Sequence, residues 1–179
     1  MAQRKAGWLD QRGVTLIETM VVVVLIGIIT LIGTLGITFY QRYELQSASR
    51  QLFGALEKVR QDAMTKRTPL IQSRGFGLRL EAGGTGYTTF EFNDIDGDFQ
   101  YDGTGEENAP AGPILFSGSI TATSNVAGVL LYDERGLYRS WNWGLVGRTY
   151  TIRRPGIATV QCIVVSMARI REEVRDGIC

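Results

Sequence analysis

The residues able to do chemistry are unevenly distributed along this chain of 179 residues. The sequence contains no histidine, which excludes Ser-His-Asp triads and zinc sites built on histidine. Its two cysteines therefore have no histidine as a general base, and nucleophilic catalysis by cysteine is not expected. No catalytic constellation emerges from the remaining residue types. We predict a protein that is not an enzyme and needs no cofactor, with Ca²⁺ as the one ion that its acids suggest.

Carboxylates are densest in a long polar stretch at residues 93–113. The candidate calcium ligands are Asp94, Asp96, Asp98, Asp102 and Glu106. Their spacing resembles the alternating oxygen ligands of a calcium-binding loop. Two positions depart from that pattern, because Phe99 stands where the sharp turn needs glycine and Gly105 where the bidentate glutamate belongs. These departures favour the alternative, a solvated acidic loop without metal.

Basic residues are separated from this acidic region along the chain. Residues 81–134 contain ten acids and no Lys or Arg, whereas residues 135–179 contain eight Arg and three acids. The guanidinium group is the preferred fork for phosphates, so Arg169 and Arg171 are candidate DNA contacts. Three neighbouring acids would pair with these arginines or screen them. A solvated edge or a contact between subunits is therefore the favoured alternative.

One further acid, Glu18, stands at the leading edge of an apolar segment. Residues 19–39 are an uncharged, mostly apolar run of 21 residues, close to the ~20 that span a bilayer as a helix. A carboxylate at membrane depth costs several kcal/mol, which suggests a partner cation. The charged residues before it are mainly basic, and the positive-inside rule keeps this segment in the cytoplasm. A cleaved signal peptide and a plain membrane anchor are the alternatives, but neither explains the acid.

The segment at residues 13–18 reads Gly-Val-Thr-Leu-Ile-Glu. With the short basic leader before it and the apolar run after it, this segment resembles the type IV pilin superfamily. It matches at every position but one, since Val14 stands where the family usually has phenylalanine. The resemblance implies that a prepilin peptidase cleaves between Gly13 and Val14 and methylates the new amine of Val14. It also implies that Glu18 neutralises the N-terminal ammonium of a neighbouring subunit, because pairing makes a charge in lipid tolerable.

The same resemblance implies partners and a location. The expected partners are prepilin peptidase, the inner-membrane assembly platform, and other pilins or pseudopilins that bind through the N-terminal helix. The expected location is the inner membrane, with a single pass and the C-terminal domain in the periplasm. The protein would later belong to a pilus or a pseudopilus at the cell surface.

The elements that position these residues are one long helix and then strands. Beyond residue 40, apolar residues recur at spacings of three and four, at Leu45, Ala48, Leu52, Ala55, Leu56, Val59 and Ala63. The first proline after them is Pro69, which disfavours helical geometry in the residue before it. We therefore expect a leader at residues 1–13 and one helix from residue 14 to about residue 67. Its transmembrane half covers residues 14–39 and its amphipathic half residues 40–68.

The remaining residues 69–179 have the pattern of a β-rich domain. Short apolar or alternating runs separated by turn residues predict strands at 76–80, 87–92, 114–116, 120–122, 126–132, 137–141, 148–152, 158–167 and 169–174. Strands that follow one long helix indicate an α+β fold. We expect the long N-terminal helix to pack on a C-terminal domain of antiparallel sheets.

Two segments of this domain resemble a narrower group, the GspH/FimT pseudopilins and minor pilins. Residues 92–98 are similar to the acidic loop of that group, and residues 163–171 to its strand and turn, with Ala168 where glycine is usual. The resemblance implies a minor pilin that initiates type IV pilus assembly near the tip. The alternative is the H-type pseudopilin of a type II secretion system. Some members act in DNA uptake, which would place Arg169 and Arg171 against DNA.

Cysteines and tryptophans are the last candidates. In a domain delivered outside the cytoplasm, Cys162 and Cys179 are expected to form a disulfide, worth about 3 kcal/mol for a loop of this length. Two free buried thiols are the alternative. Trp141 and Trp143 are expected to pack in the core against the helix, with an exposed adhesive patch as the alternative.

Overall fold

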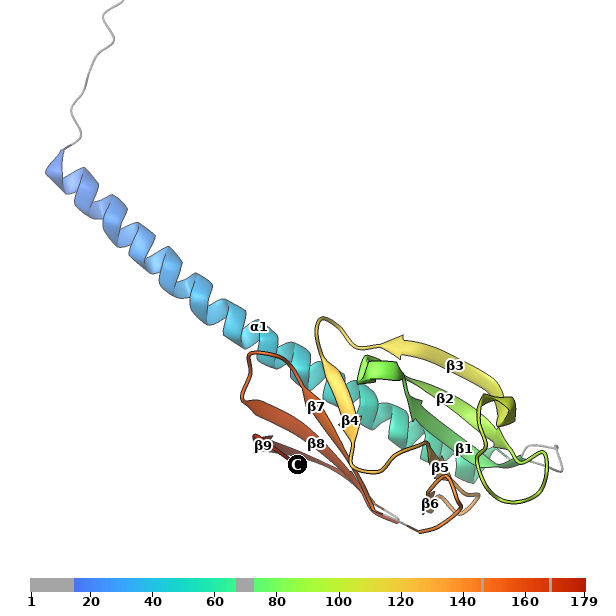
Figure 1. The fold of residues 1–179 in the computed structure, drawn as a ribbon. Helices are drawn as coiled ribbons and strands as arrows, with labels where there is room; N and C mark the ends of the chain where they lie inside the picture. Colours follow the sequence, from blue (N-terminus) through green and yellow to red (C-terminus); the bar gives the residue numbers. More distant parts are fainter. Residues whose placement is uncertain (1–14, 67–72, 146, 168) are drawn as a thin grey trace, which may run out of the picture. The chain divides into compact units, whose positions relative to one another are not determined.

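The computed structural model describes residues 15–66, 73–145, 147–167 and 169–179. It divides into two compact units, Met1–Phe39 and Tyr40–Cys179, which we describe separately. Figure 1 shows the order of the elements, one helix followed by short strands. The fold is α+β, as the sequence predicts.

Helix α1 (Leu16–Thr65) is 50 residues long. Thr15 precedes it, and its hydroxyl oxygen accepts a hydrogen bond from the amide of Glu18 at 3.3 Å, a typical N-terminal cap. In the first unit the described side chains of residues 15–39 are all exposed. An 18-residue window of this helix has a mean hydropathy of 2.8, enough by length and composition to cross a membrane.

The second unit contains two antiparallel sheets. The first sheet has the order β3-β2-β1-β5-β6, and its strands are β1 (Ser73–Leu80), β2 (Gly86–Asn93), β3 (Glu107–Leu115), β5 (Leu130–Tyr132) and β6 (Tyr138–Arg139). The second sheet has the order β4-β7-β8-β9, and its strands are β4 (Thr121–Ser124), β7 (Arg148–Arg153), β8 (Thr159–Val165) and β9 (Ile170–Asp176). Two short 3₁₀ turns, η1 (Ala82–Gly84) and η2 (Thr104–Glu106), complete the described elements.

Strand β3 is where the structure differs most from the sequence prediction. We expected a polar loop over residues 93–113, yet Glu107–Leu115 pairs along β2. The run contains Pro110 and Pro113, which usually argue against a strand. Within the described sheet, β3 lies at an edge, where the amide that proline lacks is not needed for a second neighbour.

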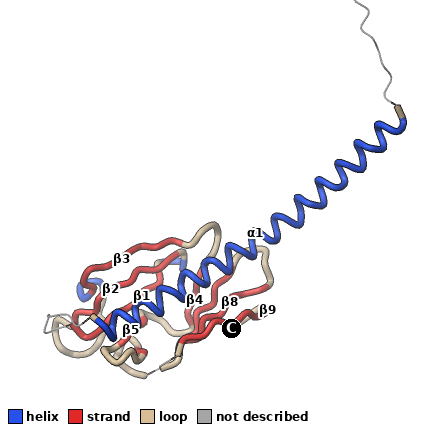
Figure 2. The backbone as a smooth tube through the Cα atoms, turned by 180° about the vertical axis from the view of Figure 1, so that it is seen from behind, coloured by secondary structure: helices blue, strands red, loops and turns tan. Residues whose placement is uncertain are grey.

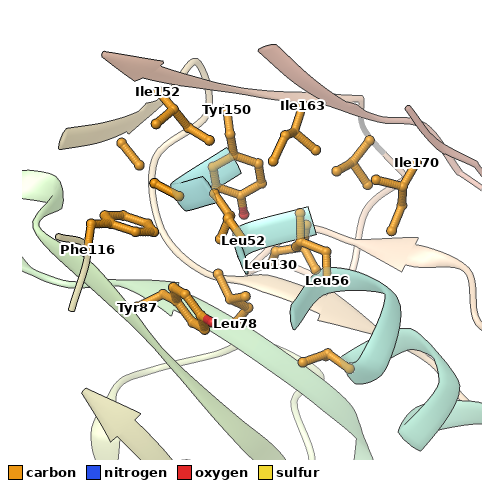
Figure 3. Packing of buried hydrophobic residues seen from close by; sticks show 14 of the residues in the cluster. Leu52, Leu56, Leu78, Tyr87, Phe116, Leu130, Tyr150, Ile152, Ile163 and Ile170 are labelled. Carbon is orange, nitrogen blue, oxygen red and sulfur yellow. The ribbon is translucent and has the colours of Figure 1, made fainter. Parts of the chain in front are cut away.

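The main core lies between α1 and the two sheets. Figure 2 shows the second half of α1 lying along both of them, and Figure 3 shows side chains from the helix and from each sheet meeting. The predicted apolar stripe is confirmed, because Leu45, Ala48, Leu52, Leu56, Val59 and Ala63 are all buried in this cluster and Ala55, the seventh predicted residue, packs against it partly buried. Their partners include Leu78 and Leu130 from the first sheet and Tyr150 and Ile163 from the second. Burying these side chains supplies the main stabilising free energy of the unit.

A second, smaller core covers the other face of the first sheet. It contains Phe90, Phe92, Val129 and Leu131, with Tyr101 and Trp143 packed against it. Gly77 makes room for it, because a Cβ there would lie 2.5 Å from the Phe90 ring and 2.8 Å from a methyl of Leu131. The expectation that both tryptophans pack against the helix is therefore wrong. Trp143 belongs to this second core, and Trp141 is 43% exposed.

Candidate functional site

The N-terminal site is built on the first turn of α1. Glu18 lies on this turn, one of the exposed residues that continue as an apolar surface through residue 39. Residues 15–39 contain no Lys or Arg, so this part of the chain supplies no cation for the carboxylate. The predicted cleavage site, Gly13 and Val14, lies outside the described residues. A cation that pairs with Glu18 must therefore come from outside residues 15–39.

The structure brings the five predicted acids of the β2–β3 loop together. Carboxylate oxygens of Asp94, Asp96 and Glu106 lie within 4.8 Å of one another, and so do those of Asp96, Asp98 and Asp102. Asp94 and Glu106 are buried, and the other three are exposed.

The same carboxylates also organise the loop. The amide of Gly97 donates to Asp94 Oδ1 at 2.9 Å, and the amide of Asp102 donates to Glu106 Oε2 at 2.8 Å. Turns of this kind are typical of Asp-rich loops without metal. Oxygen donors are also what Ca²⁺ requires, so the calcium site stays a prediction. A rise in the melting temperature on adding CaCl₂, reversed by EGTA, would confirm it.

A charged network fixes the end of this loop to the sheet. Glu107 on β3 accepts from Arg79 Nε on β1 at 2.8 Å and from the Tyr101 hydroxyl at 2.6 Å. Burial raises the pKa of Glu107. The hydrogen bonds from Arg79 and Tyr101 and the charge of Arg79 together lower it by more, so the net shift of this pKa is downward. The pKa of Tyr101 is raised, first by burial and then by the Glu107 carboxylate. The network therefore favours an ionised glutamate that holds a neutral tyrosine.

Aromatic residues lie beside the acidic loop. The amide of Tyr101 donates to the carbonyl of Trp141 at 2.7 Å, which joins this loop to the loop after β6. The rings of Phe99 and Trp143 lie 6.1 Å apart, and both residues have positive φ, at 62° and 59°. Phe99 is 42% exposed. No pattern in the sequence indicates that these two loops meet, although the two neighbouring tryptophans, Trp141 and Trp143, mark one of them.

Two of the C-terminal arginines, Arg171 and Arg175, pair with the same acid, Glu173. Arg171 Nε lies 3.0 Å from Glu173 Oε1, and Arg175 Nη2 lies 2.6 Å from Glu173 Oε2. The hydrogen bond from Arg175 is the largest of the effects that lower the pKa of Glu173. Arg169 is exposed in the turn between β8 and β9. The ion pair between Arg171 and Glu173 agrees with the expectation that neighbouring acids pair with these arginines. DNA contact by Arg169 and Arg171 stays a prediction.

Arg148, one of the eight arginines of residues 135–179, is buried. It is 1% exposed and donates from Nη1 to the carbonyl of Gly128 at 3.0 Å and from Nη2 to that of Ala127 at 3.1 Å. Its guanidinium lies 5.8 Å from the ring centres of both Tyr138 and Tyr150. Arg148 therefore supports the loop before β5 and has no surface for a ligand.

The predicted disulfide between Cys162 and Cys179 is present. Cys162 lies on β8, and the Cα atoms of the two residues are 5.8 Å apart. The bond closes the C-terminal segment, which contains β9, onto the neighbouring strand. It constrains the end of the chain in both the folded and the unfolded state.

The comparisons with known proteins bear on the N-terminal site. The family model described as the prokaryotic N-terminal methylation motif matches residues 8–34, the segment that contains Glu18 and most of the apolar run. The chain therefore carries a type IV pilin-like prepilin signal, which indicates a substrate of prepilin processing. No curated protein and no solved structure matches the chain.

Proposed function

We propose that the protein is a minor pilin of a type IV pilus that acts in filament initiation and assembly near the tip. The observation that carries this proposal is the methylation motif at residues 8–34, joined to a helix whose first half is apolar and exposed. In this proposal a prepilin peptidase cleaves between Gly13 and Val14 and methylates the amine of Val14. The mature chain waits in the inner membrane, with its β-rich domain in the periplasm.

Glu18 acts as a check on assembly in this mechanism. Its carboxylate is costly in a low-dielectric surrounding, and residues 15–39 provide no cation to offset that cost. The N-terminal ammonium of a neighbouring subunit supplies the missing charge when the two helices align. A misaligned subunit would bury two unpaired charges, so the pair favours one register between neighbouring helices.

The assignment as a minor pilin draws on the two segments that resemble the GspH/FimT group, at residues 92–98 and 163–171. The runner-up is the H-type pseudopilin of a type II secretion system, which would use the same signal and the same helix. The two are separated by the filament with which the protein copurifies. Its detection by mass spectrometry in sheared pili supports the proposal. A secretion defect without a pilus defect on deletion of the gene supports the pseudopilin.

Processing is tested on the full chain, expressed in cells so that it inserts into its native membrane. We expect mass spectrometry to find a mature N-terminus at methylated Val14. A chain that still begins at Met1 would contradict the proposal. We further expect Glu18→Ala to be processed but to enter filaments poorly, with Glu134→Ala, an exposed acid outside the helix, as the matched control. Normal incorporation of the Glu18 variant would refute the pairing mechanism.

A further inference from the structure

Exposed charge on the second half of α1 is of one sign. Arg42, Arg50 and Lys58 are exposed, whereas the acids of this stretch are half-buried. Two of those acids are ion-paired within the unit: Glu44 pairs with Arg154, and Asp62 lies 3.0 Å from Lys66. Figure 2 shows the side of α1 away from the sheets, which no strand covers. This side of the helix therefore presents cations to its surroundings.

A glycine lies between two of these cations. At 3.6 residues per turn, Arg50, Gly54 and Lys58 fall within about 80° of one another around the helix. We call these three residues the basic helix face. A Cβ at Gly54 would meet nothing within 4 Å, so packing inside this unit does not require glycine there. Glycine in a helix interior costs roughly 0.5–1 kcal/mol relative to alanine, and here it leaves a flat shelf between two positive side chains.

The β2–β3 loop and the loop after β6 form a surface of opposite character. We call it the acidic aromatic surface, and it consists of Asp96, Asp98, Phe99, Asp102 and Trp141. Its three acids are exposed and their carboxylate oxygens lie within 4.8 Å of one another. The two aromatic residues are each more than 40% exposed, and the Tyr101–Trp141 backbone bond holds their loops together. Partly exposed aromatic side chains of this kind are the usual anchors of protein interfaces.

We propose that the acidic aromatic surface of one copy of this chain binds the basic helix face of a second copy. An aromatic ring fits over the shelf at Gly54, where a larger residue would hold it away. The three carboxylates then face Arg50 and Lys58, and the ring contacts a guanidinium through its π face. In the described structure, no ion pair joins these acids to these cations within one chain. The charges are therefore complementary between copies.

The geometry of this contact is heterologous, because each copy uses two different surfaces. Such contacts build open chains of subunits rather than closed dimers. The inference rests on the proposed function for its setting, a filament tip at which neighbouring helices hold the domains of two copies close. It names the partner of the β-rich domain, which the methylation motif does not address.

The test uses the full-length chain in detergent, produced with two different affinity tags. Capture of one tagged copy by the other is measured for the wild type, for Asp98→Arg, for Arg50→Asp and for the variant that carries both changes. Each single reversal places like charges together, so we expect capture to fall about tenfold. The double variant restores opposite charges and should recover most of the loss. The matched controls are Glu134→Arg and Arg135→Asp, which reverse exposed charges outside both surfaces.

A steric variant provides an independent check. A Cβ at Gly54 meets nothing within 4 Å, and leucine is the better helix former, so Gly54→Leu should keep or raise the domain's melting temperature while capture falls. A water-soluble carbodiimide, which links a carboxylate to an amine without a spacer, should join Lys58 to an acid within residues 94–102, and peptide mass spectrometry would locate the link. Equal capture of the wild type and the single variants, or no recovery in the double variant, would overturn the proposal. Processing at Val14 in cells does not depend on this contact, so the two proposals can fail separately.

Discussion

Helix α1 has two halves of different chemistry, and one substitution made in each half separates their roles. Leu52 is fully buried between the sheets, whereas Leu25 is 51% exposed in the apolar N-terminal segment. Changing leucine to alanine in a packed core removes buried apolar area and leaves a cavity, at a cost of about 2–5 kcal/mol. Because Leu52 touches a core built from both sheets, the site has little freedom to collapse, and we expect about 3–4 kcal/mol for Leu52→Ala. In a domain of this size that is a fall in melting temperature of roughly 10 °C.

The assay is denaturant unfolding of the full-length chain in detergent, followed by tryptophan fluorescence. The third tryptophan, Trp8, is replaced by phenylalanine in every variant, so emission comes from Trp141 and Trp143 and reports on the Tyr40–Cys179 unit, where Trp143 packs in the second core. Leu25→Ala is the matched control, the same change in the same helix, and should leave the midpoint within the error of the wild type. A loss below about 1 kcal/mol for Leu52→Ala would refute the view that α1 forms the centre of this core. An equal loss of unfolding free energy in both variants would refute the conclusion that the two halves of the helix have different roles.

Two further predictions concern the C-terminal segment and the charged network. Replacing Cys179 with serine opens a loop with a sequence separation of 17, and we expect the free energy of unfolding to fall by about 3 kcal/mol. A reducing agent should cause the same fall in the wild type and should have no effect on the variant. The pKa of Glu107 is lowered in the folded state, so its stabilising contribution is present above its unfolded pKa of about 4.3 and is lost as pH falls through the lower folded value. Glu107→Gln should therefore lose less stability between pH 5 and pH 2 than the wild type does, and an unchanged pH slope would contradict the network assigned to Arg79, Tyr101 and Glu107.

Much of the protein follows from local sequence pattern. The Gly-Val-Thr-Leu-Ile-Glu segment, the apolar run after it and the change to a spacing of three and four near residue 40 predict one helix, and α1 ends within two residues of the predicted limit. Hydrophobic period and length act over neighbouring residues, so they are readable without a fold. The pair Cys162 and Cys179 needed no choice of partner, because the chain has no other cysteine.

Contacts between distant residues were decided only by the tertiary structure. Strand β3 forms despite its prolines because β2 offers it an edge, and no local pattern shows which edge is open. Arg148 is buried because carbonyls from the loop before β5 and two tyrosine rings surround it, and its neighbours in sequence do not indicate these contacts.

The site at the N-terminus follows from local sequence, whereas the surface on the β-rich domain depends on contacts between distant residues. The methylation motif is a contiguous segment that a processing enzyme recognises directly in the chain, so the sequence alone determines it. The acidic loop meets Trp141 only because β2, β3 and β6 belong to one sheet, which carries their loops to one place. Sequence periodicity gives the face on which a side chain lies, but pairing between strands far apart in the chain sets its neighbours, since that pairing depends on the packing of the whole domain.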